Sequence, residues 1–294
     1  FAIDLGINVP TGKDSLSMKQ KYPNEEVIAP GTVVISAAAN CNDITKVVEP
    51  VLKKNAGDIY YINLSQEHFK LGGSSFAQIL NTIGNDAPNI KEASYVKNVF
   101  NTIQRLIRDE KIVAGHDVAS GGLVTTLLEM CFADNNLGAE LDITALNEKD
   151  SFKVLFAENA GIVIQSLDTS IETVLANANI QYFNIVKVTG SDVLSIINHS
   201  EVFTLTISSF RDMWYKTSLL LDRKKPANGL ADARFENYKY QPLQYTFPKH
   251  FTGKLEDVIG SAVKQSHSDK QIATSQAPRN DRQKAAILRE KGSK

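Results

Sequence analysis

The sequence has few cysteines, no excess charge of either sign and no long apolar run, and each absence excludes a class of protein. Its only cysteines, Cys41 and Cys131, are too few for a disulfide framework and are typical of a reducing compartment. The formal net charge is −1, so no basic excess indicates nucleic-acid binding and no acidic block indicates a solvating tail. No apolar run is long enough to span a bilayer. We therefore expect a cytoplasmic protein that binds neither nucleic acid nor membrane.

The chain also lacks an initial methionine and a signal-peptide pattern, since it begins with Phe1. We expect it to be a piece of a longer protein. Hydrophobic residues make up 43% of the sequence and charged residues 22%, which allows a sizeable core and excludes wholesale disorder. A length of 294 residues fits one large domain or two modest ones.

The central stretch, residues 116–123 (HDVASGGL), has the most chemical interest. The apolar run 111–115 predicts a buried strand before it, and the apolar spacing of residues 123–131 predicts a helix after it. A glycine-rich turn between strand and helix presents backbone N–H groups at a helix start, where the helix dipole favours phosphate. Asp117 lies where a carboxylate could hold Mg²⁺ against that phosphate. A phosphate and Mg²⁺ site is therefore one interpretation.

The other interpretation is purely structural, and the stretch alone favours it because short motifs often occur by chance. Gly121 and Gly122 would then only allow close packing of strand and helix. Asp117 or Ser120 would only cap the helix. Cys131 lies on the apolar side of that helix, so we interpret it as a small core residue and not as a nucleophile.

A polar loop near the start of the chain is a second candidate for phosphate contact. Glycine, lysine, aspartate and two serines fall within residues 12–17, and Lys13, Asp14 and Ser15 form the centre of this loop. The loop is not a Walker A motif, because Asp14 follows Lys13 and Gly6 is one place too early for the spacing. A solvated turn explains the spacing equally well.

A third glycine-rich turn, residues 71–75 (LGGSS), repeats the plan of the central stretch. It follows a predicted strand and precedes a predicted helix, which Ser74 or Ser75 would cap. The two glycine-rich helix starts could converge on one phosphate-bearing ligand, or they could merely turn the chain twice.

Strands and helices alternate along most of the chain, which predicts α/β layers in which helices cover a sheet. The closing hairpin, residues 191–207, makes that sheet mixed. The predicted strands cover residues 32–39 (buried on both faces), 58–64, 111–115, 137–143, 162–167, 182–188, 191–197 and 202–207. The predicted helices cover residues 1–5 (ended by Gly6), 76–83, 94–110, 123–131, 152–156, 171–178 and 210–222.

The remaining segments are predicted to be less regular. Residues 23–30 should form a loop, and residues 223–282 should be polar and irregular, with a linker at 266–282. Residues 284–289 should start a new strand. We interpret the helix at 210–222 as a docking helix, with Trp214 buried in an interface.

Four motifs occur in the order and spacing of phosphoribosylformylglycinamidine synthase, the large single-chain form. They are residues 8–19 (NVPTGKDSLSMK), 71–75 (LGGSS), 116–123 (HDVASGGL) and 156–161 (FAENAG). The chain resembles this family over nearly its whole length. Residues 214–221 resemble the helix after the family's second synthetase-like half, and residues 285–293 resemble the opening of its glutaminase domain.

The resemblance implies a fold and a domain plan. The fold would be an α/β layered mixed sheet covered by helices, similar to the C-terminal domain of aminoimidazole ribonucleotide synthetase, plus an irregular linker region. Residues 1–40 would end the N-terminal subdomain of the second half, and residues 41–208 would form its C-terminal subdomain. Residues 209–283 would be the docking helix and linker, and residues 284–294 the start of a truncated glutaminase domain.

The resemblance also implies an activity, that of a ligase in purine synthesis that uses ATP, Mg²⁺ and glutamine. The family converts formylglycinamide ribonucleotide to its amidine: ATP activates the amide oxygen, ammonia from the glutaminase attacks, and phosphate leaves. The cofactors would be Mg²⁺ and ATP or ADP. The partners would be the first synthetase-like half and the glutaminase of the same chain, with a homodimer of this piece as a further option. The piece would be inactive alone.

Some site residues follow from the resemblance. Asp117 matches the aspartate that binds Mg²⁺ at a nucleotide site between the two halves, and Ser120, Gly121 and Gly122 would contact the nucleotide. The family commonly has a nucleotide-contacting serine two positions after the aspartate. Here that position is Ala119, which weakens the assignment or shifts the contact to Ser120. With the resemblance, we favour a site over a purely structural turn.

Other assignments stay open. Lys13, Asp14 and Ser15 match a site-lining loop without an assigned ligand, and neither cysteine is a catalytic candidate. Two alternatives remain: another ATP-dependent synthetase of the aminoimidazole ribonucleotide synthetase fold, and a structural or assembly half-domain without nucleotide.

Overall fold

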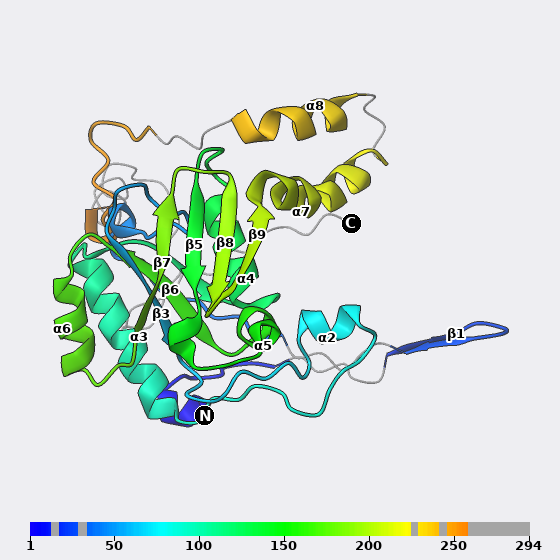
Figure 1. Cartoon of the computed structure of the whole chain (residues 1–294), viewed down its shortest axis with the longest axis horizontal. Coiled ribbons are helices and arrows are strands. Elements are labelled where there is room, and N and C mark those ends of the chain that lie inside the picture. The colour runs from blue at the N-terminus through cyan, green and yellow to red at the C-terminus, as the bar shows by residue number, and fades with distance from the viewer. Residues whose placement is uncertain (13–17, 29–33, 225–228, 241–245, 258–294) are drawn as a thin grey trace, which may run out of the picture. The chain divides into compact units, whose positions relative to one another are not determined.

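The structure is a computed structural model, and it describes residues 1–12, 18–28, 34–224, 229–240 and 246–257 (Figure 1). The chain forms two compact units. Among the described residues, 1–6 and those between 46 and 246 belong to the larger unit, and those between 7 and 45 and between 247 and 257 belong to the smaller unit. None of the helices in the described part has the length and apolar character that crossing a lipid bilayer requires.

The larger unit is built on a seven-stranded sheet with the strand order β4-β6-β3-β7-β5-β8-β9. Its strands are β3 (Asp58–Asn63), β4 (Ile112–Val118), β5 (Gly138–Asp142), β6 (Gly161–Ser166), β7 (Phe183–Thr189), β8 (Val193–Asn198) and β9 (Glu201–Thr206). All neighbouring strands are antiparallel except β5 and β8, which are parallel. The predicted mixed sheet is confirmed, and the predicted strands between residues 58 and 207 are confirmed with small shifts at their ends.

Helices cover both faces of this sheet. Strand β3 shows why: Ile59 and Tyr61 belong to one apolar core, and Tyr60 and Ile62 belong to another, because alternate side chains of a strand point to opposite faces. The first core packs against α4 (Gly122–Cys131) and α5 (Ser151–Phe156). The second core packs against α3 (Ala93–Arg108) and α6 (Ser170–Asn177), which lie side by side in Figure 1. These four helices confirm the predictions.

Local signals explain where several elements begin and end. α1 (Ala2–Leu5) ends at Gly6, which has a left-handed backbone (φ 76°), as predicted. α2 (Ser75–Ile79) begins after Ser74, whose side chain accepts a hydrogen bond from the N–H of Ala77 at 3.2 Å. The prediction that a serine caps this helix is therefore confirmed for Ser74, although the helix is shorter than predicted.

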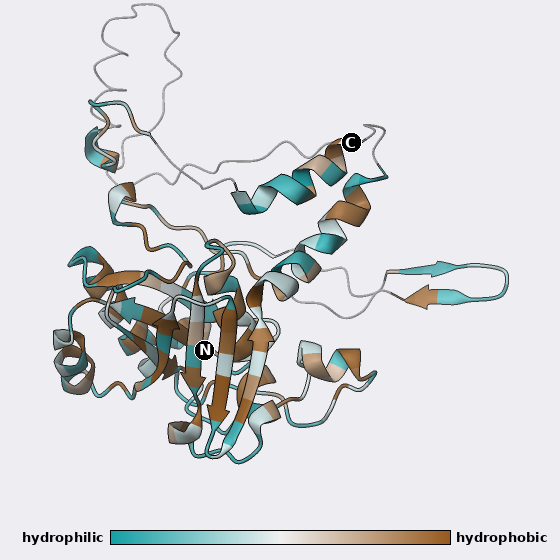
Figure 2. Ribbon diagram, turned by 45° about the horizontal axis from the view of Figure 1, so that its top comes forward, coloured by the Kyte–Doolittle hydropathy of each residue, from teal (hydrophilic) through white to brown (hydrophobic). Residues whose placement is uncertain are grey.

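The chain continues from β9 directly into α7 (Ile207–Asp222), followed by α8 (Leu230–Asn237) and the 3₁₀ turn η3 (Tyr238–Tyr240). The prediction of irregular structure was wrong for α8, in which hydrophilic and hydrophobic residues are mixed, as the ribbon colours of Figure 2 show. It packs on α7 through a ring contact between Tyr215 and Phe235, with 6.0 Å between centroids. Local composition does not reveal this contact.

Trp214 lies on the surface of the described part of the chain, so its burial in an interface with a neighbouring domain stays a prediction. Its side chain is 59% exposed, and its ring lies 6.0 Å from that of Phe132. The buried side chains of α7 are Ile207, Arg211 and Leu219, so Trp214 lies at the margin of the buried face.

The smaller unit contains the hairpin of β1 (Lys19–Lys21) and β2 (Glu26–Ile28). The predicted loop at residues 23–30 was therefore wrong for β2. The predicted buried strand at 32–39 was also wrong where the structure describes it: residues 34–39 form no strand, and Val34 and Ile35 are 83% and 87% exposed. A strand needs a hydrogen-bonded neighbour as well as β propensity, and no described residue pairs with this segment. The linker at 266–282 and the strand at 284–289 lie outside the described residues.

Candidate functional site

Two strand–turn–helix units end at the same edge of the sheet. β3 leads through residues 64–74 to α2, and β4 leads through residues 119–121 to α4. β6 lies between β3 and β4 and is antiparallel to both, so its first residues meet the last residues of both neighbours. The segment just before β6, residues 156–160, therefore lies between the two glycine-rich turns.

The sheet register brings Glu158 to these turns. β4 and β6 pair Val118 with Gly161, and three residues beyond each lie Gly121 and Glu158. The N–H of Gly121 donates to Oε1 of Glu158 at 2.8 Å. The N–H of Ser75, the first residue of α2, donates to the same oxygen at 2.7 Å. One carboxylate oxygen thus holds two helix starts, where the helix dipole favours negative charge.

Asn159 binds the longer connection, residues 64–74, which joins β3 to α2. Its side chain is buried, and its Oδ1 accepts a hydrogen bond from the N–H of Lys70 at 3.1 Å. Its Nδ2 donates to Oγ of Ser65 at 2.9 Å and to the carbonyl oxygen of His68 at 3.1 Å. Two consecutive residues of the FAENAG motif therefore fix both turns.

The glycines of the central turn are used for packing. Gly122 is buried with φ 73°, and a Cβ there would lie 2.5 Å from the carbonyl oxygen of Leu155 on α5. Its N–H donates to the carbonyl oxygen of Ala119 at 3.0 Å. The close approach is thus to a neighbouring helix. The N–H groups of both Gly121 and Gly122 are engaged inside the protein.

Capping of α4 by a side chain was the other part of the structural interpretation, and it was wrong. Gly121 is the N-cap residue with φ 87°, and no side-chain capping bond is made there. Asp117 and Ser120 both lie exposed instead. Neither side chain therefore caps α4.

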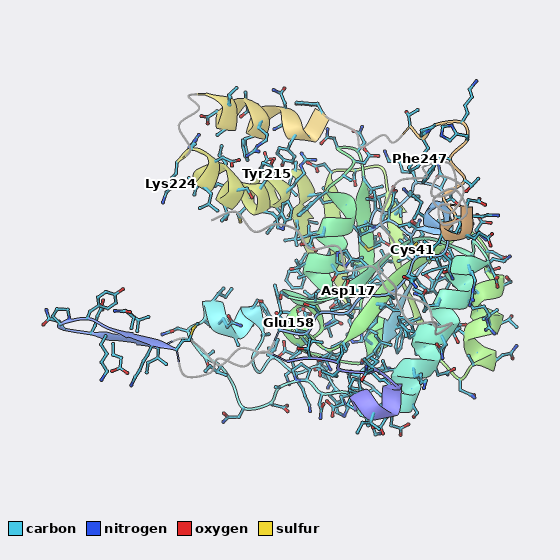
Figure 3. The ribbon with its side chains drawn as sticks, turned by 180° about the vertical axis from the view of Figure 1, so that it is seen from behind. Cys41, Asp117, Glu158, Tyr215, Lys224 and Phe247 are labelled. Carbon is cyan, nitrogen blue, oxygen red and sulfur yellow. The ribbon has the colours of Figure 1, made fainter. Side chains whose placement is uncertain are left out.

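Asp117, which is labelled together with Glu158 in Figure 3, is the candidate metal ligand next to this turn. β4 extends to Val118, so Asp117 belongs to the strand, and Thr126 of α4 donates to its carbonyl oxygen at 3.2 Å. Its side chain is 74% exposed, with Oδ1 3.4 Å from Nδ1 of His116. The other imidazole nitrogen, Nε2, lies 3.3 Å from Oε2 of Glu129.

A complete metal shell is not formed by the described residues, which contain no group of three or more His, Cys, Asp or Glu side chains able to hold an ion. A single exposed carboxylate still fits Mg²⁺, because Mg²⁺ keeps several waters and binds one or two carboxylates together with substrate phosphates. Lys13, Asp14 and Ser15 lie outside the described residues.

The interpretation of Cys131 as a small core residue is confirmed, because its side chain is buried. Burial raises the pKa of the Cys131 thiol to about 12, whereas Cys41 is exposed in the smaller unit.

Sequence reasoning noticed the FAENAG motif but gave Glu158 and Asn159 no role. Their partners lie 37 and 83 residues away for Glu158, and about 90 residues away for Asn159. The available signal was a glutamate and an asparagine just before a buried strand.

Two family models match the chain. The model described as AIR synthase related protein, C-terminal domain, matches residues 62–197, which include both glycine-rich turns and Glu158. The model described as FGAR-AT PurM_N-like domain matches residues 1–40.

A protein of Arabidopsis thaliana, named probable phosphoribosylformylglycinamidine synthase, chloroplastic/mitochondrial, is 34% identical in an alignment that covers 99% of this chain. The chain belongs to the phosphoribosylformylglycinamidine synthase family. The phosphoribosylformylglycinamidine synthase of Homo sapiens is 35% identical over 83% of the chain. These alignments cover 20% and 19% of the two relatives, so the chain spans about a fifth of the length of the phosphoribosylformylglycinamidine synthases it matches.

A solved structure, T. maritima PurL complexed with FGAR, is also similar to the chain. The match has a TM-score of 0.46 and 14% identity, and it covers 57% of this chain and 30% of the other.

Proposed function

We propose that the chain supplies part of a Mg²⁺-nucleotide site in an ATP- and glutamine-dependent ligase of purine biosynthesis. The ligase converts formylglycinamide ribonucleotide to formylglycinamidine ribonucleotide. The observation that carries the proposal is the exposed carboxylate of Asp117, which lies beside a turn whose N–H groups are hydrogen-bonded to the rest of the fold. An exposed acid on a fixed turn is suited to bind a ligand that arrives from outside this chain.

Each residue of the turn has a proposed role. Asp117 would hold Mg²⁺, and the exposed hydroxyl of Ser120 would contact a phosphate oxygen. Gly121 and Gly122 would contribute the shape of the turn, since their N–H groups are already bonded. A bound Mg²⁺ would neutralise phosphate charge that these residues alone leave uncompensated.

Lys13, Asp14 and Ser15 belong to the proposal as a second site-lining loop, on the strength of the motif at residues 8–19. We also propose that further domains of the same polypeptide, a first synthetase-like half and a glutaminase, complete the active site. The length of the relatives supports this part. The proposal further includes a cytoplasmic location and a homodimer of the isolated chain, which sedimentation would detect as a doubled molar mass.

A titration with ADP tests the site, with and without Mg²⁺, followed by the backbone amide NMR signals so that weak binding is visible. The variants are Asp117→Asn and, as a matched control, Asp142→Asn, which removes the charge of an exposed aspartate at the end of β5. We expect Mg²⁺-dependent shifts at Ser120 and Gly121 in the wild type and the control. Shifts of equal size in Asp117→Asn would contradict the metal assignment.

A further inference from the structure

We propose that Glu158 is a positioning residue that links the two glycine-rich turns through hydrogen bonds to both. A ligand that binds at one turn would then also stabilise the backbone of the other. The ligand part of this inference rests on the proposed function. The joining itself rests only on the fold.

The joining is made by a single atom. Oε1 of Glu158 accepts hydrogen bonds from the N–H of Ser75 at 2.7 Å and from the N–H of Gly121 at 2.8 Å. Both distances are those of charge-assisted hydrogen bonds, which are roughly twice as strong as neutral ones. Because the two donors are the start of α2 and the residue before α4, moving either helix start disturbs a bond shared with the other.

The backbone around Glu158 is fixed on both sides, which makes the carboxylate a stable reference point. On one side, the ring of Phe156 stacks on the ring of Phe76 in α2, with 4.8 Å between centroids. On the other side, the buried amide of Asn159 binds the loop at residues 65–70 through three hydrogen bonds. The side chain therefore reaches the two N–H groups from a position that neighbouring residues hold.

The geometry also limits how a phosphate can approach. While Glu158 is in place, the N–H of Gly121 is occupied by a protein carboxylate and is not a donor to an incoming anion. The direct contacts of a nucleotide therefore fall to Asp117, through Mg²⁺, and to Ser120. Glu158 would act on these residues through the backbone of the turn and would not touch the ligand.

Amide hydrogen exchange of the whole chain tests the joining without any ligand. We expect Glu158→Ala to raise the exchange rates of both Ser75 and Gly121 about tenfold or more, since each loses a charge-assisted bond. Glu158→Gln should keep both rates within about threefold of wild type, because the amide oxygen has the same reach and two lone pairs.

The matched control is Asp192→Ala. Asp192 accepts a hydrogen bond from the N–H of Ser208 at 2.9 Å near the start of α7, far along the sheet order from the two turns. The Asp192→Ala variant should leave the amide exchange rates of Ser75 and Gly121 unchanged. A Glu158→Ala variant in which only one of the two amides changes, or a Glu158→Gln variant that behaves like Glu158→Ala, would overturn the inference.

The same exchange measurement with saturating Mg²⁺-ADP tests the coupling. In the wild type, we expect slower exchange at Gly121 and also at Ser75 on the other turn; in Glu158→Ala, the effect at Ser75 should vanish. Slowing at Gly121 without slowing at Ser75 in the wild type would overturn the coupling. Absence of any ADP effect in the wild type would overturn the nucleotide contacts proposed for Asp117 and Ser120 of this chain, while the ligand-free result would still decide whether Glu158 joins the turns.

Discussion

Replacing Gly122 by alanine should be much more harmful than replacing Gly73, which has a similar backbone but open space around it. Gly122 has φ 73°, which costs an L residue about 1–2 kcal/mol. Its new Cβ would also lie 2.5 Å from the carbonyl oxygen of Leu155 and 2.8 Å from backbone atoms of Phe156, so α4 or α5 must shift. Overpacking of this kind costs about 1–3 kcal/mol. The expected loss of unfolding free energy is therefore about 2–5 kcal/mol.

Two other glycines separate the two contributions. Gly73 has φ 75° with nothing within 4 Å of a new Cβ, so Gly73→Ala should cost only the backbone term of about 1–2 kcal/mol. Gly190 has open space and no positive φ, so Gly190→Ala should lie within about 0.5 kcal/mol of wild type.

Urea unfolding followed by far-UV circular dichroism measures these differences, provided that the variants share one denaturant slope. The expected order of loss is Gly122 first, then Gly73, then Gly190. If Gly122→Ala and Gly73→Ala lose the same free energy, the tight approach of α4 to α5 is refuted, and Gly122 would be free for another role.

Three further predictions follow from single contacts. Under native conditions a thiol reagent should label Cys41 and leave Cys131 unlabelled until unfolding, because burial raises the pKa of Cys131 to about 12; rapid labelling of both would contradict this. The ion pair with Lys111 lowers the pKa of the Asp168 carboxyl from 3.8 to about 2. The pair therefore stabilises the folded state fully at pH values above the pKa of Asp168 in the unfolded chain, and this stabilisation is lost as the pH falls towards 2. Asp168→Asn should flatten that acid-side decline in urea unfolding, and an unchanged decline would argue against the pair. Asn159→Ala removes three hydrogen bonds and should cost about 3 kcal/mol in the same assay, whereas a loss under about 1 kcal/mol would count against its role.

Much of the larger unit could be predicted because its signals are local. Residues 58–63 are apolar at all four inner positions, which is typical of a strand covered on both faces, and the spacing of α3 places its apolar residues on one side. Turn chemistry at Gly6 and Ser74 was readable for the same reason. Each of these signals depends on neighbours within a few residues.

The errors occurred where distant partners decide the structure. Residues 34–39 have strong β propensity, yet no described strand pairs with them. α8 lies in a segment of polar and mixed composition, yet Phe235 packs on α7. In both cases tertiary contact overrides local preference.

The candidate site was predicted in the same uneven way. Asp117 and Ser120 stand out because they belong to one short motif beside a glycine pair. Glu158 did not, because its contact with Gly121 depends on the register of β4 against β6, which no local pattern contains. The register also shows that the two glycine-rich turns converge on a protein carboxylate, an outcome that neither sequence interpretation included.

The central claim is that a metal-bound nucleotide binds at Asp117, and a paramagnetic ion tests it most directly. Mn²⁺ accepts the oxygen ligands that suit Mg²⁺ and broadens nearby NMR signals. With Mn²⁺ and ADP, we predict selective broadening of the amide signals of Val118, Ser120 and Gly121 in the wild type, and its loss in Asp117→Asn. Broadening centred elsewhere in the described chain, or unchanged in Asp117→Asn, would contradict the claim.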